Sequence, residues 1–331
     1  MKLKHLASLI FVGAVIALAG SLGIVKASQH NRQTVIGVLV PLHHPALRQI
    51  YSGMKDELAA EGYHNGKNIK IVYENANGDQ SNLHTMADKL INSHAKVLVG
   101  IATPACQALA NGTKSTPIVM GDIGDPKGAG LIKNEKHPEG NVTGVHGVQP
   151  IHQQLALVKK FMPKMKKLGV IYTSSDDSAT AQYKQMAKEA KKMHINLKAY
   201  TIANSNDLNQ VSQQMLSEVD AVIVPSDNTI ASSIQTLIKN ANAVNKPVFP
   251  GAETMVKQGG VATVTNSQYG AGRETGKFVA QLLKGKQPAN LPVKDYDQGV
   301  VSLNVKQAKK LGLTIPAGIE KQARKNHMLY K

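Results

Sequence analysis

Residues 98–109 read LVGIATPACQAL, and this stretch decides the fold class. Leu98 to Ala102 are apolar and typical of a buried strand, whereas the residues after Thr103 and Pro104 have a helical pattern. Thr103 is expected to cap that helix, and Pro104 suits its first turn, where a missing N–H costs nothing. A helix N-terminus with free N–H groups also attracts anions. The stretch therefore predicts an α/β unit with one candidate binding loop.

The alternation of strands and helices continues along the chain and then repeats. The first series of predicted strands is TVIGVLVP (34–41), IKIVYENA (69–76) and AKVLVGIA (95–102). The second series is LGVIYT (168–173), LKAYTIA (197–203) and AVIVPS (221–226). Strands that alternate with helices form βαβ units and parallel sheets. We therefore predict an α/β protein with two similar lobes, each built on a doubly wound parallel sheet.

The chain is basic, with a net charge of +17 from 39 Lys and Arg and 22 Asp and Glu. Its lysines lie along predicted helical stretches such as KKFMPKMKK (159–167) and KEAKKMH (188–194), in which Phe161 is the single aromatic residue. This pattern favours solvated helix faces over a nucleic-acid surface, and we expect no nucleic-acid partner. An anionic cell-wall polymer would also suit such a surface.

The N-terminus is typical of an exported protein. Lys2 and Lys4 precede an uncharged run over 6–25, and IVKAS (24–28) predicts cleavage before Ser28. The run of about 20 residues could also span a bilayer. Residues 1–27 are therefore predicted to be a signal peptide or an uncleaved anchor, and the protein to be extracellular and associated with the cell surface.

Lipidation of the N-terminus is excluded by the cysteine content. ALAGS (17–21) resembles a lipoprotein box, but Ser21 stands where the modified Cys would be. The single cysteine, Cys106, lies far downstream on an apolar helical face. We expect it to be a small buried hydrophobic residue.

Six loops follow the predicted strands and are rich in Ser, Thr, Asp, Gly or Pro. They span residues 41–47, 102–107, 120–130, 173–179, 225–232 and 249–255. Ligands of open parallel sheets bind at the carboxyl ends of the strands. Two lobes that face one another would place these loops on the walls of a single cleft.

Motifs for catalysis, cofactors or metals are absent from the sequence. There is no G-x-S-x-G, P-loop or H-E-x-x-H motif, and GDPKGAG (124–130) and GAGRETG (270–276) do not have dinucleotide-binding spacing. The histidines are scattered except for the adjacent pair His43 and His44, which would rarely chelate one metal together. We therefore expect no enzyme activity, no cofactor and no metal site.

The polar residues of the loops suit an amino acid zwitterion. Helix N-termini with Thr103, Ser174, Ser175 and Ser178 could hold a carboxylate, and Asp227, Glu253 or Asp125 could hold an ammonium group. His43, His44 and Pro45 could pack against an aromatic side chain. The candidate ligand-binding residues are His43, His44, Pro45, Ala102, Thr103, Pro104, Ala105, Asp122, Asp125, Ser174, Ser175, Ser178, Asp227, Asn228 and Glu253.

The chain from 36 to 285 resembles the substrate-binding proteins of ABC importers, in particular the tryptophan- and tyrosine-binding group. The stretches that carry the resemblance are HPALRQIYSGMKDELAAEGYHNGKNIKI (44–71), NANGDQSNL (75–83), IATPACQALAN (101–111), GDIGDPKGAGL (121–131), NVTGV (141–145), VPSDNTIAS (224–232) and AGRETG (271–276). The resemblance implies a type I periplasmic-binding fold with three crossovers between the lobes. It also implies an extracellular receptor that delivers an amino acid to an ABC permease.

The resemblance sets the expected domain boundaries. Lobe one is expected to comprise residues 34–148 and 252–286, and lobe two residues 149–251 and 287–331. The three hinge strands are expected near Gly147–Pro150, Pro250–Ala252 and Lys284–Pro292.

Two departures from the family pattern leave alternatives open. Ser21 replaces the family's lipidated Cys, and Ala252 precedes Glu253 where the family often has a second acidic residue, so Asp227 and Glu253 both stay candidates for the ammonium partner. We expect a monomeric receptor that captures Trp, Tyr or Phe. The alternative is a ligand-sensing ectodomain on the same fold, tethered by an uncleaved N-terminal helix.

Overall fold

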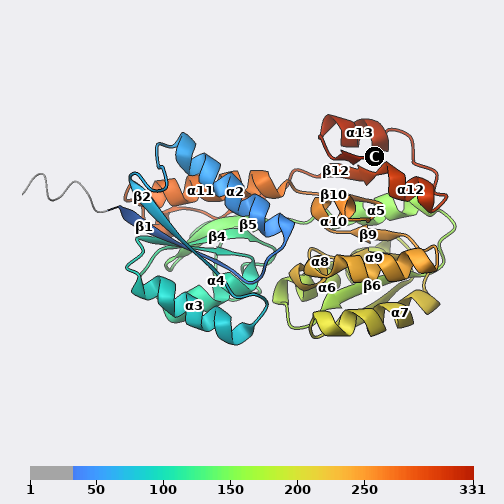
Figure 1. Cartoon of the computed structure of the whole chain (residues 1–331), viewed down its shortest axis with the longest axis horizontal. Helices are drawn as coiled ribbons and strands as arrows, with labels where there is room; N and C mark the ends of the chain where they lie inside the picture. The colour runs from blue at the N-terminus through green and yellow to red at the C-terminus, as the bar shows by residue number, and fades with distance from the viewer. Residues whose placement is uncertain (1–32) are drawn as a thin grey trace, which may run out of the picture.

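The structure is a computed structural model that describes residues 33–331. The predicted signal peptide or anchor, residues 1–27, lies outside the described residues. Figure 1 shows two lobes side by side along the long axis of the molecule. No helix within residues 33–331 has both the length and the apolar character needed to cross a membrane.

Lobe one is built on a parallel sheet of six strands in the order β11-β5-β4-β3-β1-β2. The strands are β1 (Thr34–Val40), β2 (Ile69–Asn75), β3 (Val97–Ile101), β4 (Ile118–Ile123), β5 (Val142–Gly147) and β11 (Lys294–Tyr296). Helices α2 (Pro45–Ala60) and α11 (Gln268–Leu283) cover one face of the sheet, and α3 (Gln80–Asn92) and α4 (Thr103–Gly112) cover the other (Figure 1). A short 3₁₀ helix, η3 (Pro288–Asn290), precedes β11.

The central strands β1, β3 and β4 of this sheet are buried on both faces, which is why they read as nearly continuous hydrophobic runs. In β3, Val97, Val99 and Ile101 pack with α2 and α11, while Leu98 packs with α3 and α4. Helices α2 and α11 approach one another closely, because a Cβ atom at Gly272 would lie only 2.1 Å from the Ile50 carbonyl oxygen.

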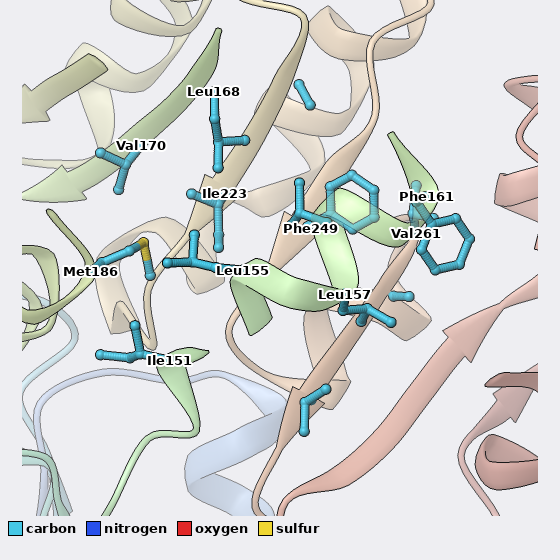
Figure 2. Close-up of a cluster of buried hydrophobic side chains, with 14 of the residues drawn as sticks. Ile151, Leu155, Leu157, Phe161, Leu168, Val170, Met186, Ile223, Phe249 and Val261 are labelled. Atoms are coloured by element: carbon cyan, nitrogen blue, oxygen red, sulfur yellow. The ribbon is translucent and has the colours of Figure 1, made fainter. Parts of the chain in front are cut away.

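Lobe two combines a parallel sheet of four strands, ordered β7-β6-β8-β9, with a three-stranded sheet ordered β10-β12-β13. The strands are β6 (Leu168–Thr173), β7 (Leu197–Ile202), β8 (Ala221–Val224), β9 (Val248–Pro250), β10 (Ala262–Thr265), β12 (Val300–Asn304) and β13 (Leu329–Tyr330). The helices are α5 (Ile151–Phe161), α6 (Asp177–Lys192), η2 (Ser205–Asp207), α7 (Leu208–Glu218), α8 (Asn228–Ser232), α9 (Ile234–Ala243), α10 (Glu253–Lys257), α12 (Val305–Lys310) and α13 (Ile319–Lys325). Figure 2 shows one core of this lobe, in which Leu155 and Phe161 of α5 lie against Val170 and Phe249 of the parallel sheet.

The chain crosses between the lobes three times, and two of the crossovers lie outside the ranges expected from the sequence. The first joins β5 to α5 around residues 148–150, as expected. The second, expected at 250–252, follows β10 at 266–267, because β10 pairs with β12 and Val261 donates its N–H to the Val248 carbonyl group of lobe two. The third, expected at 284–292, follows β11 at 297–299, because β11 pairs with β5 of lobe one. Residues 252–266 therefore belong to lobe two, and residues 287–296 belong to lobe one.

A single buried side chain ties the three crossovers together. The Asn266 amide nitrogen donates to the Val148 carbonyl oxygen at 2.7 Å and to the Tyr296 carbonyl oxygen at 2.8 Å. Its amide oxygen accepts from the Gln298 N–H at 2.7 Å. Asn266 is fully buried, so these backbone groups depend on its amide for their hydrogen bonds.

Replacing this amide should loosen the junction of the lobes. Asn266→Asp removes both donated hydrogen bonds and points a carboxylate oxygen at two carbonyl groups, which should lower the free energy of unfolding by about 2–5 kcal/mol. Urea denaturation followed by circular dichroism measures the loss. The exposed Asn290→Asp serves as the control for the added charge, and equal stability of the two variants would contradict the assigned role.

Candidate ligand-binding site

A cavity lies between the lobes at the carboxyl ends of their parallel strands. Its polar lining residues are His44, Thr103, Asp122, Gln149, Ser178, Gln182, Ser226, Asp227, Asn228 and Gln268. Its other lining residues are Ala46, Leu47, Ile50, Ala102, Gly124, Ala231, Ala252 and Met255. About 50 Å³ is open to the centre of a water-sized sphere, so the lobes meet closely. Among the described residues that line it there are two Asp side chains but no Lys or Arg.

The lobe-one wall is built from backbone in an unusual conformation. Ala102 follows β3 with a φ of 72°, and Asp122 lies in β4 with a φ of 64°. The pairing of β4 with β5 shifts register between Met120 and Ile123, which places Asp122 in this irregularity. Residues other than glycine rarely adopt positive φ angles, and such strained backbone positions are concentrated at functional sites. Two of them on neighbouring strands of one cavity therefore mark this wall as a candidate site.

The Asp122 carboxyl group is buried without a full set of partners. Its Oδ1 atom has no hydrogen-bond partner within residues 33–331. Burial raises the pKa of Asp122 to about 6, against the lowering effects of the nearby His146 and of a hydrogen bond from Gln268. Gly147 leaves room for the carboxyl group, since a Cβ atom there would lie 2.1 Å from Oδ1. The cavity thus contains a carboxyl group that an added cation would satisfy.

The N-terminus of α4 also faces this cavity and lacks a side-chain cap. The prediction that Thr103 caps the helix is wrong, because the turn at Ala102 makes Ala102 the N-cap and Thr103 the first helical residue. Pro104 has no N–H, and Cys106 donates its own to Ala102. The N–H groups of Thr103 and Ala105 are left for a ligand or water.

Other helix starts at the cleft carry their own caps. Asp227 begins α8, and its carboxylate accepts from the Thr173 N–H at 2.5 Å, the Thr173 hydroxyl at 2.9 Å and the Ile230 N–H at 3.0 Å. Asp176 caps α6 by accepting from Ser178 and Ala179. Burial raises the pKa of both carboxyl groups, to about 6 for Asp176. Because both oxygens of Asp227 are already bonded within lobe two, this carboxylate is poorly placed to take a ligand ammonium as its main partner.

His44 caps α2 and bridges the cleft. Its Nδ1 atom accepts from the Ala46 N–H at 3.2 Å, so the ring proton sits on Nε2, which lies 2.8 Å from Asn228 Oδ1 in the other lobe. Burial lowers the pKa of His44 to about 4, and the nearby Arg48 adds to this effect against the hydrogen bond to Asn228. His44 is therefore a neutral donor at pH 7.

The remaining predicted residues lie in several places. Pro104 and Ser175 line a neighbouring pocket, and His43 and Pro45 line an outer groove that also contains Arg48 and Lys257. Ser174 donates to the Ile202 carbonyl group, and Asp125 accepts from Gly128 within its own turn. Glu253 begins α10 and is buried outside the cavity lining, and burial raises its pKa. Ala105 is fully buried in α4, and Cys106 is fully buried as expected.

Sequence reasoning missed three glutamines that line the cavity. Gln149 and Gln268 lie beside the first and second crossovers, which the sequence did not place together. Gln182 follows Ser178 by one helical turn on α6, and that spacing could have identified it. Its amide accepts from the Ser226 N–H at 3.0 Å and donates to the Ser178 hydroxyl at 3.3 Å.

The lobes are in contact across the cleft at several places. His44 meets Asn228 as described, and Gln107 Nε2 of α4 lies 3.0 Å from Asp177 Oδ2 of α6. A Cβ atom at Gly124 would lie 2.3 Å from the Ser178 hydroxyl oxygen of the other lobe. The structure therefore has its two lobes closed on one another.

Comparison with known proteins identifies the family. A sequence profile described as ABC transporter substrate binding protein matches residues 35–327. The chain belongs to the family of ABC transporter substrate-binding proteins. This confirms the resemblance and the fold class inferred from the sequence.

Three relatives of the chain are informative. A tyrosine-binding protein of Clostridioides difficile (strain R20291) is 32% identical over 288 residues, which are 87% of this chain and 84% of that protein. The ABC domain in complex with L-Trp from Streptococcus pneumonia is 41% identical, with a TM-score of 0.86 over 88% of this chain and 99% of that one. A ligand-free, open substrate-binding protein with adhesive properties from Clostridium difficile is 30% identical, with a TM-score of 0.67 over 86% of this chain and 97% of that one. The lower TM-score to the ligand-free, open structure agrees with the closed lobes seen here.

The buried His44 should make stability depend on pH. Its folded-state pKa of about 4 is below the ordinary value of 6.5, so the unfolded chain binds the proton more tightly between these values. The stability that neutral His44 provides is complete above pH 6.5 and is lost as the pH falls toward 4. His44→Asn keeps a capping residue but does not titrate.

Between pH 7 and 4.5, wild type should lose about 2 kcal/mol more unfolding free energy than His44→Asn. Urea denaturation at both pH values gives the difference directly. Because the variant retains every other titrating group, parallel losses in the two proteins would refute a buried neutral imidazole.

Proposed function

We propose that this protein is the extracellular receptor of an ABC importer, and that it captures an aromatic amino acid between its lobes and delivers it to a membrane permease. The family assignment supports the role of a substrate-binding protein. The chemistry of the cavity supports an amino acid as the ligand. Residues 1–27, which resemble a signal peptide, would direct the export of the protein. The proposed partner is the membrane permease to which a substrate-binding protein of this family delivers its ligand.

The observation that carries the proposal is the charge pattern of the cavity. The lining contains the unsatisfied Asp122 carboxyl group and no Lys or Arg, so the ligand has to bring the positive charge. The uncapped start of α4 at Thr103 favours a negative group. In this proposal Asp122 holds the ligand ammonium, and the N–H groups of α4 with the Thr103 hydroxyl hold the ligand carboxylate.

The apolar part of the lining supports an aromatic side chain. Leu47 and Ile50 of α2 face Ala231 and Met255 of lobe two across the cavity. Methionine and aliphatic side chains adapt well to aromatic rings. The similarity to a tyrosine-binding protein and to a domain with bound L-Trp points to the same ligand class. Because the empty cleft is narrow, we expect the lobes to part for entry and to close around the ligand.

A thermal-shift screen against the twenty amino acids tests the ligand class. A ligand that binds only the folded protein raises the melting temperature, by an amount that corresponds to about 2.7 kcal/mol at a hundredfold excess over Kd. We expect selective shifts with L-Trp, L-Tyr or L-Phe, in protein unfolded and refolded to remove bound ligand. No shift with any amino acid would contradict the proposal.

The variant Asp122→Asn should show how much the proposed ammonium site contributes to ligand affinity. Loss of a charge-assisted hydrogen bond costs about 1.5–3 kcal/mol, so affinity for the ligand found in the screen should fall about 10- to 150-fold by calorimetry. Binding to wild type should also weaken below about pH 6, because the Asp122 carboxyl group then takes up a proton that the ammonium group must displace.

Asp125→Asn is the matched control, since Asp125 lies in the same loop and bonds only its own turn. Equal affinities of the Asp122 and Asp125 variants would exclude Asp122 as the ammonium partner.

A further inference from the structure

Three potential metal ligands converge on the outer edge of lobe one, and none of them is among the residues that line the cavity. His146 of β5 has its Nδ1 atom 2.8 Å from Asp295 Oδ1 of β11 and 3.3 Å from Glu135 Oε1 of the β4–β5 connection. One donor atom from each residue lies within 4.8 Å of the other two. The sequence analysis expected no metal site because the histidines are scattered, but the fold brings together residues that are 160 positions apart.

The backbone holds these side chains in place. Asp295 lies directly beside His146 in the parallel pairing of β11 with β5. The Val293 N–H donates to the Glu135 carbonyl oxygen at 2.7 Å, which fixes the connecting segment against β11. The side chains of His146, Glu135 and Asp295 are 20%, 38% and 65% exposed, so the cluster opens to solvent on one side.

The cluster differs from an ordinary surface ion pair. In a chain with a net charge of +17, neither Glu135 nor Asp295 has a Lys or Arg partner within residues 33–331. Both carboxylates instead lie close to the same imidazole nitrogen, His146 Nδ1, which can carry only one proton. The pair of His152 and Glu189 shows the contrast, because there a single carboxylate group meets His152 at 2.8 Å and is also neutralised by Lys192.

We propose that Glu135, His146 and Asp295 bind one divalent transition-metal ion, with Zn²⁺ as the best fit. The ion would replace the proton between His146 Nδ1 and the two carboxylates. One imidazole and two carboxylates are suitable zinc ligands, and water from the open side would complete a four-coordinate site. The half-exposed carboxylates need only small rotations to reach metal–oxygen distances of about 2.0–2.2 Å.

The position of the site gives the ion a structural role at the hinge. Strand β5 leads into the first crossover and β11 into the third, and the Val148 N–H donates to the Tyr296 carbonyl oxygen where the two segments leave lobe one. An ion on His146 and Asp295 would fasten these strands just before the point where Asn266 joins them to the second crossover. Binding should therefore stabilise the folded protein, independently of which ligand the cleft takes.

Calorimetric titration of the EDTA-treated, dialysed full-length protein with ZnCl₂ tests the proposal. We expect one site on wild type, and at least a tenfold loss of zinc affinity in Asp295→Asn and in Glu135→Gln, which keep the size of each side chain. Zinc should raise the melting temperature of wild type but not of Asp295→Asn. Mg²⁺ should bind more weakly than Zn²⁺, because imidazole is a poor ligand for it.

His152→Asn provides the matched control, since it removes a histidine that also contacts a carboxylate, and it should retain wild-type zinc affinity. The proposal is overturned if wild type binds no zinc at 1 mM. It is equally overturned if Asp295→Asn and Glu135→Gln bind zinc as tightly as His152→Asn, because the zinc would then occupy other histidines.

Discussion

The hydrogen bonds of Asn266 hold the three crossovers at one point, and the geometry of the cleft depends on them. The amide satisfies backbone groups of the first and third crossovers while it belongs to the second. Gln149 and Gln268, which line the cavity, lie next to residues that take part in this junction. The two lobes are otherwise separate hydrophobic cores, so the place where they can turn relative to one another is set by a few buried polar groups rather than by apolar packing.

Three helix starts at the cleft have a capping side chain, whereas the start of α4 has none. Asp227 caps α8, Asp176 caps α6 and His44 caps α2. Each side chain therefore accepts a hydrogen bond from the backbone of its own lobe. Helix α4 begins at Thr103 without such a side chain, so its N-terminus carries an uncompensated partial positive charge. The Asp122 carboxyl group nearby is negative, and its Oδ1 atom has no hydrogen-bond partner within residues 33–331. A negative group and a positive helix end in one cavity suit a zwitterion. Among the described residues that line the cavity there is no Lys or Arg that would favour a simple anion.

Periodicity was sufficient to predict the strands β1, β2, β3, β6, β7 and β8, because buried parallel strands read as apolar runs bounded by turn residues. It failed at the crossovers. Strand β11 is the polar stretch Lys294–Tyr296, so it lacks the hydrophobic pattern of a buried strand. Strand β10 was not predicted because it is short and follows a pair of glycines after α10. It also did not distinguish the capping Asp227 from Asp122, since both aspartates follow a predicted apolar strand. Only the positive φ of Ala102 and Asp122 and the hydrogen bonds around them separate these roles.

The environment of Asp122 bears on how closure of the lobes is coupled to ligand binding. In the closed cleft, burial raises the pKa of Asp122 to about 6, and no Lys or Arg is among the described residues that line the cavity with it. The contacts of His44 with Asn228 and of Gln107 with Asp177 join the two lobes directly, without involving a ligand. A ligand can shift the equilibrium only through a difference in its affinity for the two states. In the proposed function, an ammonium group that pairs with Asp122 in the closed cleft supplies that difference.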